Sequence, residues 1–234
     1  MFINYAHRGA SEYAPENTMS AFYLGILQGA NGIETDVRRT KDGVLVLFHD
    51  KNLLRVTGHE GAIADYNYRD LLQLRIRNAK TNTEDILVKL EDFLRYFAFR
   101  DLQFAIELKD ADIESDVLAL LERFEMKEKT VVTSFKFDYI KRFKSIAPSY
   151  RVGYLTDDFV DQKLADMKMI GGEQLCPKAE SVTAEKTECW HRMGFSVRAW
   201  GVADTALMER VYACGADGMT VNFPDLLTAH IAKE

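Results

Sequence analysis

The chain alternates between short runs rich in β-branched and aromatic residues and longer segments of helical period. Apolar residues recur at i, i+3 and i+4 in the longer segments, as expected for helices with one buried face. This alternation is typical of βαβ units around a parallel sheet. We predict strands at 2–6, 32–37, 44–48, 102–108, 130–134, 151–155, 173–176, 196–200 and 218–221, and helices that include 18–28, 113–124, 139–146, 184–193 and 206–213.

The strand predicted at 44–48 is an exception to the βαβ pattern. Only residues 38–43, which include the dipeptide Asp42-Gly43, separate it from the strand at 32–37. This connection is too short for a parallel crossover, and Asp-Gly favours a hairpin turn. We therefore predict an antiparallel hairpin after strand two. The other eight strands predict an α/β fold, a (β/α)8 TIM barrel, with its site at the carboxyl ends of the strands.

The crossover at about 51–88 is unusually long. It contains Gly58, Gly61, two tyrosines and a short helical pattern at 68–74, which predict a small insertion over the barrel mouth. No Pro/Gly/Ser-rich linker, charge block or low-complexity tract divides the chain. We therefore expect residues 1–234 to form a single barrel domain that carries this insertion.

Composition narrows the classes of partner. The 234 residues are 47% hydrophobic and 28% charged, as in an ordinary globular protein, and the net charge of −6 disfavours nucleic acid and anionic lipid. We expect no stable membrane insertion, because no run approaches the ~18 apolar residues of a membrane span. The lack of a secretory signal and of paired cysteines predicts a cytoplasmic protein with reduced thiols. The oligomeric state stays open, a homo-oligomer included.

Three carboxylates are predicted to meet at the barrel mouth. Glu34 and Asp36 are two residues apart at a strand end, so both side chains point to the same face. Glu107 ends the strand expected beside them, with Lys109 on its own face. Converging carboxylates suit a hard divalent cation, and Lys109 suits a phosphate group. The alternatives are separate surface salt bridges for the first pair and a structural ion pair between Glu107 and Lys109.

Two histidines also end predicted strands. His7 and Arg8 close the first strand before Gly9, and His49 closes the hairpin strand. Imidazole titrates near pH 6.5, so histidines at one rim can act as general base and general acid. Arg8 suits bidentate recognition of a phosphate. For the remaining histidines, at 59, 191 and 230, we favour a structural hydrogen-bonding role.

Together these motifs resemble the glycerophosphodiester phosphodiesterase family. The order and the spacing of the motifs both match over nearly the whole chain. The matching residues are His7-Arg8-Gly9, Pro15-Glu16-Asn17-Thr18, Glu34-x-Asp36, His49-Asp50 and Glu107-x-Lys109, followed by Ser134-Phe135, Trp200, Gly215-Ala216-Asp217-Gly218 and Asn222-x-Pro224.

The resemblance implies one divalent ion, Mg²⁺ or Ca²⁺, on the three carboxylates, acid/base roles for the two histidines, and phosphate contacts from Arg8 and Lys109. It implies that Asp50 orients a histidine or contacts the substrate, and that Asn17 organises the loop around the first histidine. Thr18 is a candidate cap for the first helix. Trp200 either stacks on the substrate or packs at the rim.

Two stretches depart from the family pattern. Trp200-Gly201-Val202-Ala203 and Val88-Lys89-Leu90 replace the more usual Trp-Thr-Val-Asn and Pro-Thr-Leu. Neither change touches a candidate ligand, so they bear on the choice of head group.

The implied reaction is the hydrolysis of small glycerophosphodiesters to glycerol 3-phosphate and an alcohol. A lysophospholipase D activity would use the same residues but would need an apolar groove or a membrane-binding surface. A non-catalytic phosphodiester-binding barrel is the third alternative. It predicts loss of at least one of the two histidines or the three carboxylates, and all five are present.

Overall fold

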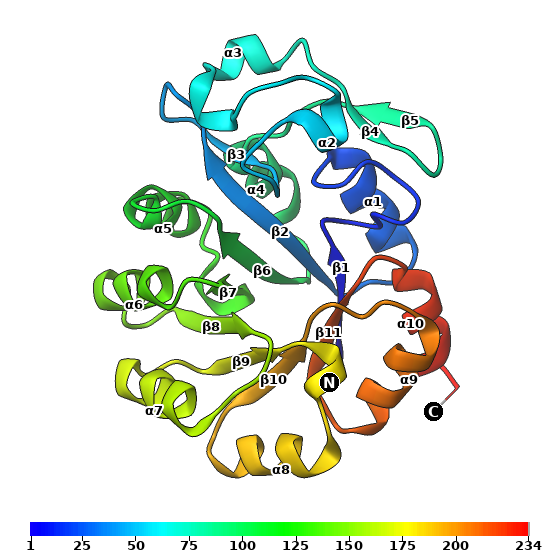
Figure 1. Ribbon diagram of the computed structural model, residues 1–234, viewed down its shortest axis with the longest axis vertical. Helices are drawn as coiled ribbons and strands as arrows, with labels where there is room; N and C mark the ends of the chain where they lie inside the picture. The colour runs from blue at the N-terminus through cyan, green and yellow to red at the C-terminus, as the bar shows by residue number, and fades with distance from the viewer. Residues whose placement is uncertain (234) are drawn as a thin grey trace.

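A computed structural model describes residues 1–233, and its centre is a closed ring of eight parallel strands (Figure 1). The ring closes because β1 pairs in parallel with both β2 and β11. This architecture confirms the predicted TIM barrel. The barrel strands are β1 (Ile3–His7), β2 (Gly32–Arg39), β6 (Gln103–Leu108), β7 (Thr130–Ser134), β8 (Arg151–Thr156), β9 (Gln174–Pro177), β10 (Ser196–Ala199) and β11 (Gly218–Val221).

The ninth strand, β3 (Leu45–Leu47), runs antiparallel to β2 with Leu47 opposite Val37. The turn between them contains Gly43 at a φ of 84°, a conformation that favours glycine. The predicted hairpin after strand two is therefore present. It delivers the residues that follow β3 back to the end of the barrel where β2 leaves it.

Helices surround the ring, and each predicted helix is found within two residues of its expected ends. The prediction omitted α7 and α10, and it placed no bounds on the helix after the insertion, α4. The helices are α1 (Met19–Leu27), α4 (Leu90–Phe97), α5 (Glu114–Arg123), α6 (Phe137–Ile146), α7 (Asp161–Ile170), α8 (Ala184–Arg192), α9 (Thr205–Ala213) and α10 (Pro224–Ile231), with 3₁₀ turns at Lys127–Lys129 and Ala179–Ser181.

The insertion after β3 has its own small structure. It comprises α2 (Leu54–Thr57), a 3₁₀ turn (Ile63–Asp65), α3 (Tyr68–Leu71) and a hairpin of β4 (Ile76–Asn78) and β5 (Thr83–Asp85). Its apolar side chains form a separate cluster with Val46 and Phe48. The insertion lies beside the mouth, next to α1, and not across it (Figure 1). The helical pattern expected at 68–74 ends at residue 71, and the β4–β5 hairpin was not predicted.

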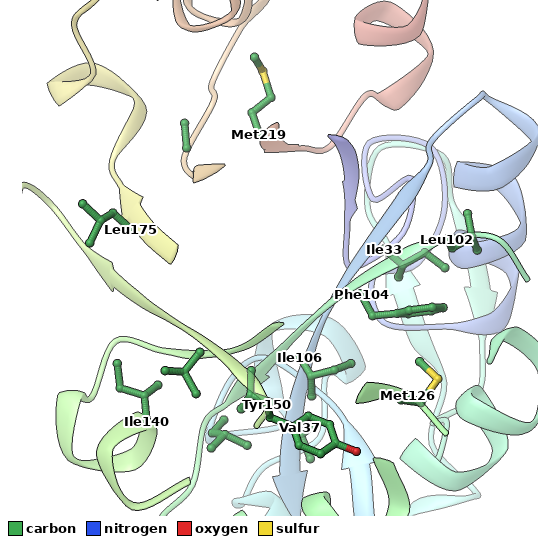
Figure 2. Packing of buried hydrophobic residues seen from close by; sticks show 14 of the residues in the cluster. Ile33, Val37, Leu102, Phe104, Ile106, Met126, Ile140, Tyr150, Leu175 and Met219 are labelled. Atoms are coloured by element: carbon green, nitrogen blue, oxygen red, sulfur yellow. The ribbon is translucent and has the colours of Figure 1, made fainter. Parts of the chain in front are cut away.

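The main apolar core lies between the barrel and its helices. Ile33 and Val37 of β2 and Phe104 of β6 all belong to this core, and Figure 2 shows Ile33 beside Phe104. Side chains alternate along a strand, so Glu34 and Asp36 point to the opposite side, into the barrel. Within residues 1–233, no helix combines the length and the apolar character that crossing a membrane requires.

Candidate active site

The strand register brings the predicted site residues together at one end of the barrel. His7, the last residue of β1, pairs with Glu34 on β2. Asp36, two residues further along β2, pairs with Glu107 on β6. His7 and Glu107 lie at or next to the carboxyl ends of their strands, and the pairing places Glu34 and Asp36, within the longer β2, at the same end of the barrel, where TIM barrels place their chemistry.

The three predicted metal ligands converge on one point. Glu34, Asp36 and Glu107 are buried, and each offers a carboxylate oxygen within 4.8 Å of the others. Ligands on opposite sides of a calcium ion, at about 2.3–2.6 Å each, lie about 5 Å apart, so this spacing suits a single ion. Asp36 Oδ1 is buried and accepts no hydrogen bond from the described residues. The donor set of three carboxylates therefore fits a hard divalent cation.

Two cations border the carboxylates. Lys109 Nζ lies 2.6 Å from Glu107 Oε1 and 3.3 Å from Asp36 Oδ1, and Arg8 Nε lies 3.1 Å from Asp36 Oδ2. Burial raises the pKa of the Asp36 carboxyl, but Lys109 and Arg8 outweigh burial and hold this pKa well below its ordinary value. Asp36 is therefore a permanently charged centre. The ion pair proposed as the structural alternative for Lys109 is present, within the same cluster as the converging carboxylates.

The other two carboxyls are harder to ionise. Burial raises the pKa of Glu34 to about 8, and the negative charges of Asp36 and Glu107 add to the effect. Burial likewise raises the pKa of Glu107 to about 7, against the opposing influence of Lys109. Protein without a bound cation thus carries protons on this cluster near neutral pH. A divalent ion would displace them, because the ligands must be ionised to bind it.

Asn17 supports the cluster from the loop that follows β1. Its Nδ2 donates to Asp36 Oδ2 at 2.9 Å, and its Oδ1 accepts from the Thr35 hydroxyl at 2.7 Å. Its backbone N–H donates to the Arg8 carbonyl, so it also ties the loop around the histidine, as predicted. Thr18 caps α1 by accepting from the Ala21 N–H. The hydrogen bond from Asn17 to Asp36, a candidate metal ligand, was not predicted from the sequence.

His7 is fixed in one tautomer. Its Nδ1 lies 2.6 Å from Asn222 Oδ1, an amide oxygen that can only accept, so Nδ1 carries the proton. Nε2 is left with its lone pair, 3.9 Å from Glu34 Oε2. Enclosure by the protein and the nearby Arg8 guanidinium lower the pKa of His7 to about 3, although 30% of its side chain remains open to the cavity. The ring is therefore neutral near pH 7.

His49 has a carboxylate partner. Its Nδ1 lies 2.8 Å from Asp50 Oδ1, a contact through which the carboxylate can orient the ring. Burial lowers the pKa of His49, and Asp36 and Asp50 oppose that effect. The backbone of His49 is held as well, since Arg38 Nε and Nη2 donate to its carbonyl oxygen at 3.0 and 2.8 Å.

Both histidines line a cavity of 190 Å³ together with Arg8, Glu34 and Glu107. Its far wall is apolar, because Phe135 and Trp200 meet edge to face with their ring centroids 4.8 Å apart. Trp200 Nε1 donates to the Thr156 carbonyl at 3.1 Å. This indole is thus fixed by a backbone hydrogen bond and packs against Phe135 while it forms part of the cavity wall.

Three further residues belong to the site but were not predicted. Arg198 on β10 is 1% exposed and lines the cavity floor, where it contacts Gln174 and Thr220. Arg38 holds the His49 backbone, and Asn222 holds His7. Arg198 could have been found because it is a charged residue within the predicted strand at 196–200. Arg38 could have been found because it lies two residues after Asp36 and so points to the same face of the strand. Asn222 was noticed as part of a motif but was given no role.

Comparison with known proteins places the chain among phosphodiesterases. The family model described as "Glycerophosphoryl diester phosphodiesterase family" matches residues 7–226. A glycerophosphodiester phosphodiesterase from Bacillus altitudinis is 32% identical over 94% of this chain and 94% of its own length. The crystal structure of a glycerophosphodiester phosphodiesterase from Agrobacterium tumefaciens is 26% identical, with a TM-score of 0.86 over 98% of this chain and 100% of its own.

A phosphodiesterase from Oleispira antarctica, solved in complex with the product sn-glycerol-3-phosphate, is 23% identical with a TM-score of 0.86 and covers 98% of this chain and 96% of its own. At that identity it supports the fold alone. The matched range of the family model includes both candidate histidines and all three converging carboxylates. The resemblance seen in the sequence is thereby confirmed: the chain belongs to the glycerophosphoryl diester phosphodiesterase family and is an enzyme, a phosphoric diester hydrolase.

Proposed function

We propose that this protein hydrolyses small glycerophosphodiesters to glycerol 3-phosphate and an alcohol, using one divalent cation and a pair of histidines. The observation that carries the proposal is the meeting of three carboxylates and two histidines around one cavity of 190 Å³. The relative from Oleispira antarctica that was solved with sn-glycerol-3-phosphate supports this choice of product.

Glu34, Asp36 and Glu107 would hold the cation, either Mg²⁺ or Ca²⁺, since both prefer carboxylate oxygens. When bound, it would supply Lewis-acid stabilisation of negative charge on the phosphoryl group. Asn17 keeps Asp36 oriented toward the shared point through its hydrogen bond.

Arg8 and Lys109 bind the phosphate and offset the charge that develops on its oxygens. Both already lie within 3.3 Å of the carboxylate cluster, so they provide positive charge that needs little rearrangement during the reaction. An acidic protein with a net charge of −6 needs such local cations to attract a phosphodiester.

The two histidines divide the proton transfers. His7 is neutral and presents Nε2, so it removes the proton from the attacking oxygen. The Asp50 carboxylate behind His49 stabilises an imidazolium, so His49 protonates the departing alcohol. Each transfer typically contributes ~100-fold to 10,000-fold in rate.

Incubation of purified enzyme with glycerophosphocholine, glycerophosphoethanolamine and matched lysolipids tests the activity. The readout is release of choline or ethanolamine, which both reactions produce, together with glycerol 3-phosphate from the diesters and lysophosphatidic acid from the lysolipids. We expect turnover of the diesters in Mg²⁺ or Ca²⁺ and none after chelation. Exclusive turnover of lysolipids would favour the lysophospholipase D alternative, and binding without turnover would favour the non-catalytic one. Phosphorus NMR of the early reaction distinguishes attack by water from attack by the glycerol 2-hydroxyl, which passes through a cyclic phosphate.

A further inference from the structure

A second cavity, of 280 Å³, adjoins the catalytic one. It shares His7 and Arg8 with the first cavity, and its other walls come from the loop after β1, from Asn222 just after β11, and from the insertion. We propose that this cavity binds the alcohol arm of the substrate and favours an alcohol that carries a second anionic group, a phosphate monoester or a carboxylate, with Arg77 and Lys80 as the ligands of that group. This inference rests on the proposed function and extends it to the substrate class.

The residues that line each cavity indicate which arm of the substrate it binds. The first is built from the ends of barrel strands and ends at the wall of Phe135 and Trp200, so it suits the glycerol arm that every substrate shares. The second is lined by residues of the insertion, which suits the arm that differs between substrates. Arg55 connects it to the catalytic acid, because its guanidinium contacts both Glu16 and the Asp50 that orients His49.

The hairpin that supplies the two cations is anchored and not free to move away. Asn78, at the end of β4, is 8% exposed, and its Nδ2 donates to the carbonyl oxygens of Ser11 and Ala14 at 3.0 and 2.9 Å. Its Oδ1 accepts from the Lys80 N–H at 2.9 Å. These bonds fix the backbone between Arg77 and Lys80 against the loop that follows β1. The hairpin and this loop lie side by side in Figure 1.

The charges of these two side chains are available to a ligand. Lys80 Nζ contacts Glu12, and Arg77 Nε contacts Glu84. Glu12 is half-buried, but 67% of the Lys80 and 63% of the Arg77 side chain are open to solvent. Exposed pairs of this kind contribute little free energy. A substrate anion can therefore replace the carboxylates, with a charge-assisted hydrogen bond to each cation.

The lining also disfavours a cationic head group. The cavity residues, all within the described part of the chain, include four cations, Arg8, Arg55, Arg77 and Lys80, against the carboxylates of Glu12 and Glu16. No phenylalanine, tyrosine or tryptophan is among them. A quaternary ammonium therefore finds no aromatic face to contact, which is the usual means of binding choline.

Matched substrate pairs test the proposal. Glycerophosphoinositol 4-phosphate differs from glycerophosphoinositol by one phosphate, and glycerophosphoserine differs from glycerophosphoethanolamine by one carboxylate. We expect kcat/KM to be about tenfold higher for the anionic member of at least one pair, as for one added charge-assisted hydrogen bond. The two pairs separate a preference for phosphate from a preference for carboxylate. The ratio should fall as ionic strength rises, because the two cations are exposed.

Three variants assign the effect to residues. The double change Arg77→Gln with Lys80→Gln should bring the ratio within each pair close to one. Glu12→Gln should raise it, because Lys80 loses its competing partner. Arg95→Gln is the matched control, since this arginine is 59% exposed and paired with a glutamate on α4, away from the cavity. It should leave the ratio unchanged.

Calorimetric binding of the inositol pair to His49→Ala protein measures the same ratio without turnover. Affinity that favours the phosphorylated diester and is lost in the double variant supports the proposal. The serine–ethanolamine pair is measured in the same way. Equal affinities within both pairs, or a preference that survives in the double variant, would overturn the proposal. Failure to hydrolyse any diester would instead count against the proposed function, so the two failures are distinguishable.

Discussion

Replacing Glu34 with glutamine should stabilise the protein when metal is removed and abolish its stabilisation by metal. Glu34 is 4% exposed and shares its surroundings with Asp36 and Glu107, so its ionised form is costly without a cation. Glutamine keeps the shape of the side chain and an oxygen that can accept from the Arg8 N–H, but it carries no charge.

The magnitude follows from the pKa of the carboxyl. Burial and the neighbouring charges raise the pKa of Glu34 from 4.5 to about 8 in the folded protein. Each unit of pKa corresponds to ~1.4 kcal/mol, so the protonated carboxyl contributes at most about 5 kcal/mol to the stability of the metal-free fold. Because the folded-state pKa is the higher one, this stability is fully present below pH 4.5 and is lost as pH rises toward 8. The free energy of unfolding of Glu34→Gln should therefore exceed that of the parent most clearly above pH 8.

The assay is urea unfolding in a chelator between pH 5 and 9, repeated with excess Mg²⁺ or Ca²⁺. At 100 times its dissociation constant, metal should add about 2.7 kcal/mol to the parent and nothing to Glu34→Gln. Glu114→Gln is the control, since this glutamate is also buried but pairs with Arg142 outside the site, so its loss should destabilise the protein. If Glu34→Gln were less stable than the parent at pH 8.5 without metal, or were still stabilised by it, the metal assignment would be wrong.

Other predictions concern the groups that orient the site. Asn17→Gly removes the amide that donates to Asp36 while tolerating the φ of 57° at this position, and calorimetry should show about 10-fold to 100-fold weaker metal binding. Asp50→Asn should lower the pKa of His49 and move the alkaline limb of the kcat–pH profile to lower pH. Asn222→Ala removes the acceptor that fixes the tautomer of the base, and kcat should fall by at least about tenfold, measured with an unaltered Tm as the sign of an intact fold.

Much of the barrel and of the metal cluster follows from local sequence signals. The periodicity of apolar residues predicted the alternation of strands and helices, and Asp42-Gly43 indicated the hairpin. The spacing of two residues between Glu34 and Asp36 places both on one face of a strand, whatever surrounds it. Such features depend on alternation along a single strand, so they can be predicted without knowing which segments meet.

The unpredicted features depend on partners distant in the sequence or on weak local patterns. Asn222 contacts His7 across 215 positions, which only closure of the barrel brings about. The β4–β5 hairpin consists mainly of polar residues and lacks the alternation of a half-buried strand. In α7 only Leu164 and Met167 are buried, too few for a clear helical period.

The central claim is that His7 and His49 divide the proton transfers at one phosphorus, and the dependence of rate on the leaving group tests it most directly. The measurement is kcat for the parent, His7→Ala and His49→Ala across glycerophosphodiesters whose alcohols span a wide range of pKa. We predict losses of at least ~100-fold for both variants on poor leaving groups. Only His49→Ala should recover toward the parent as the alcohol becomes more acidic, because an activated leaving group needs no proton. The same dependence in both variants, or nearly full activity of His49→Ala on a diester with a poor leaving group, would contradict the account.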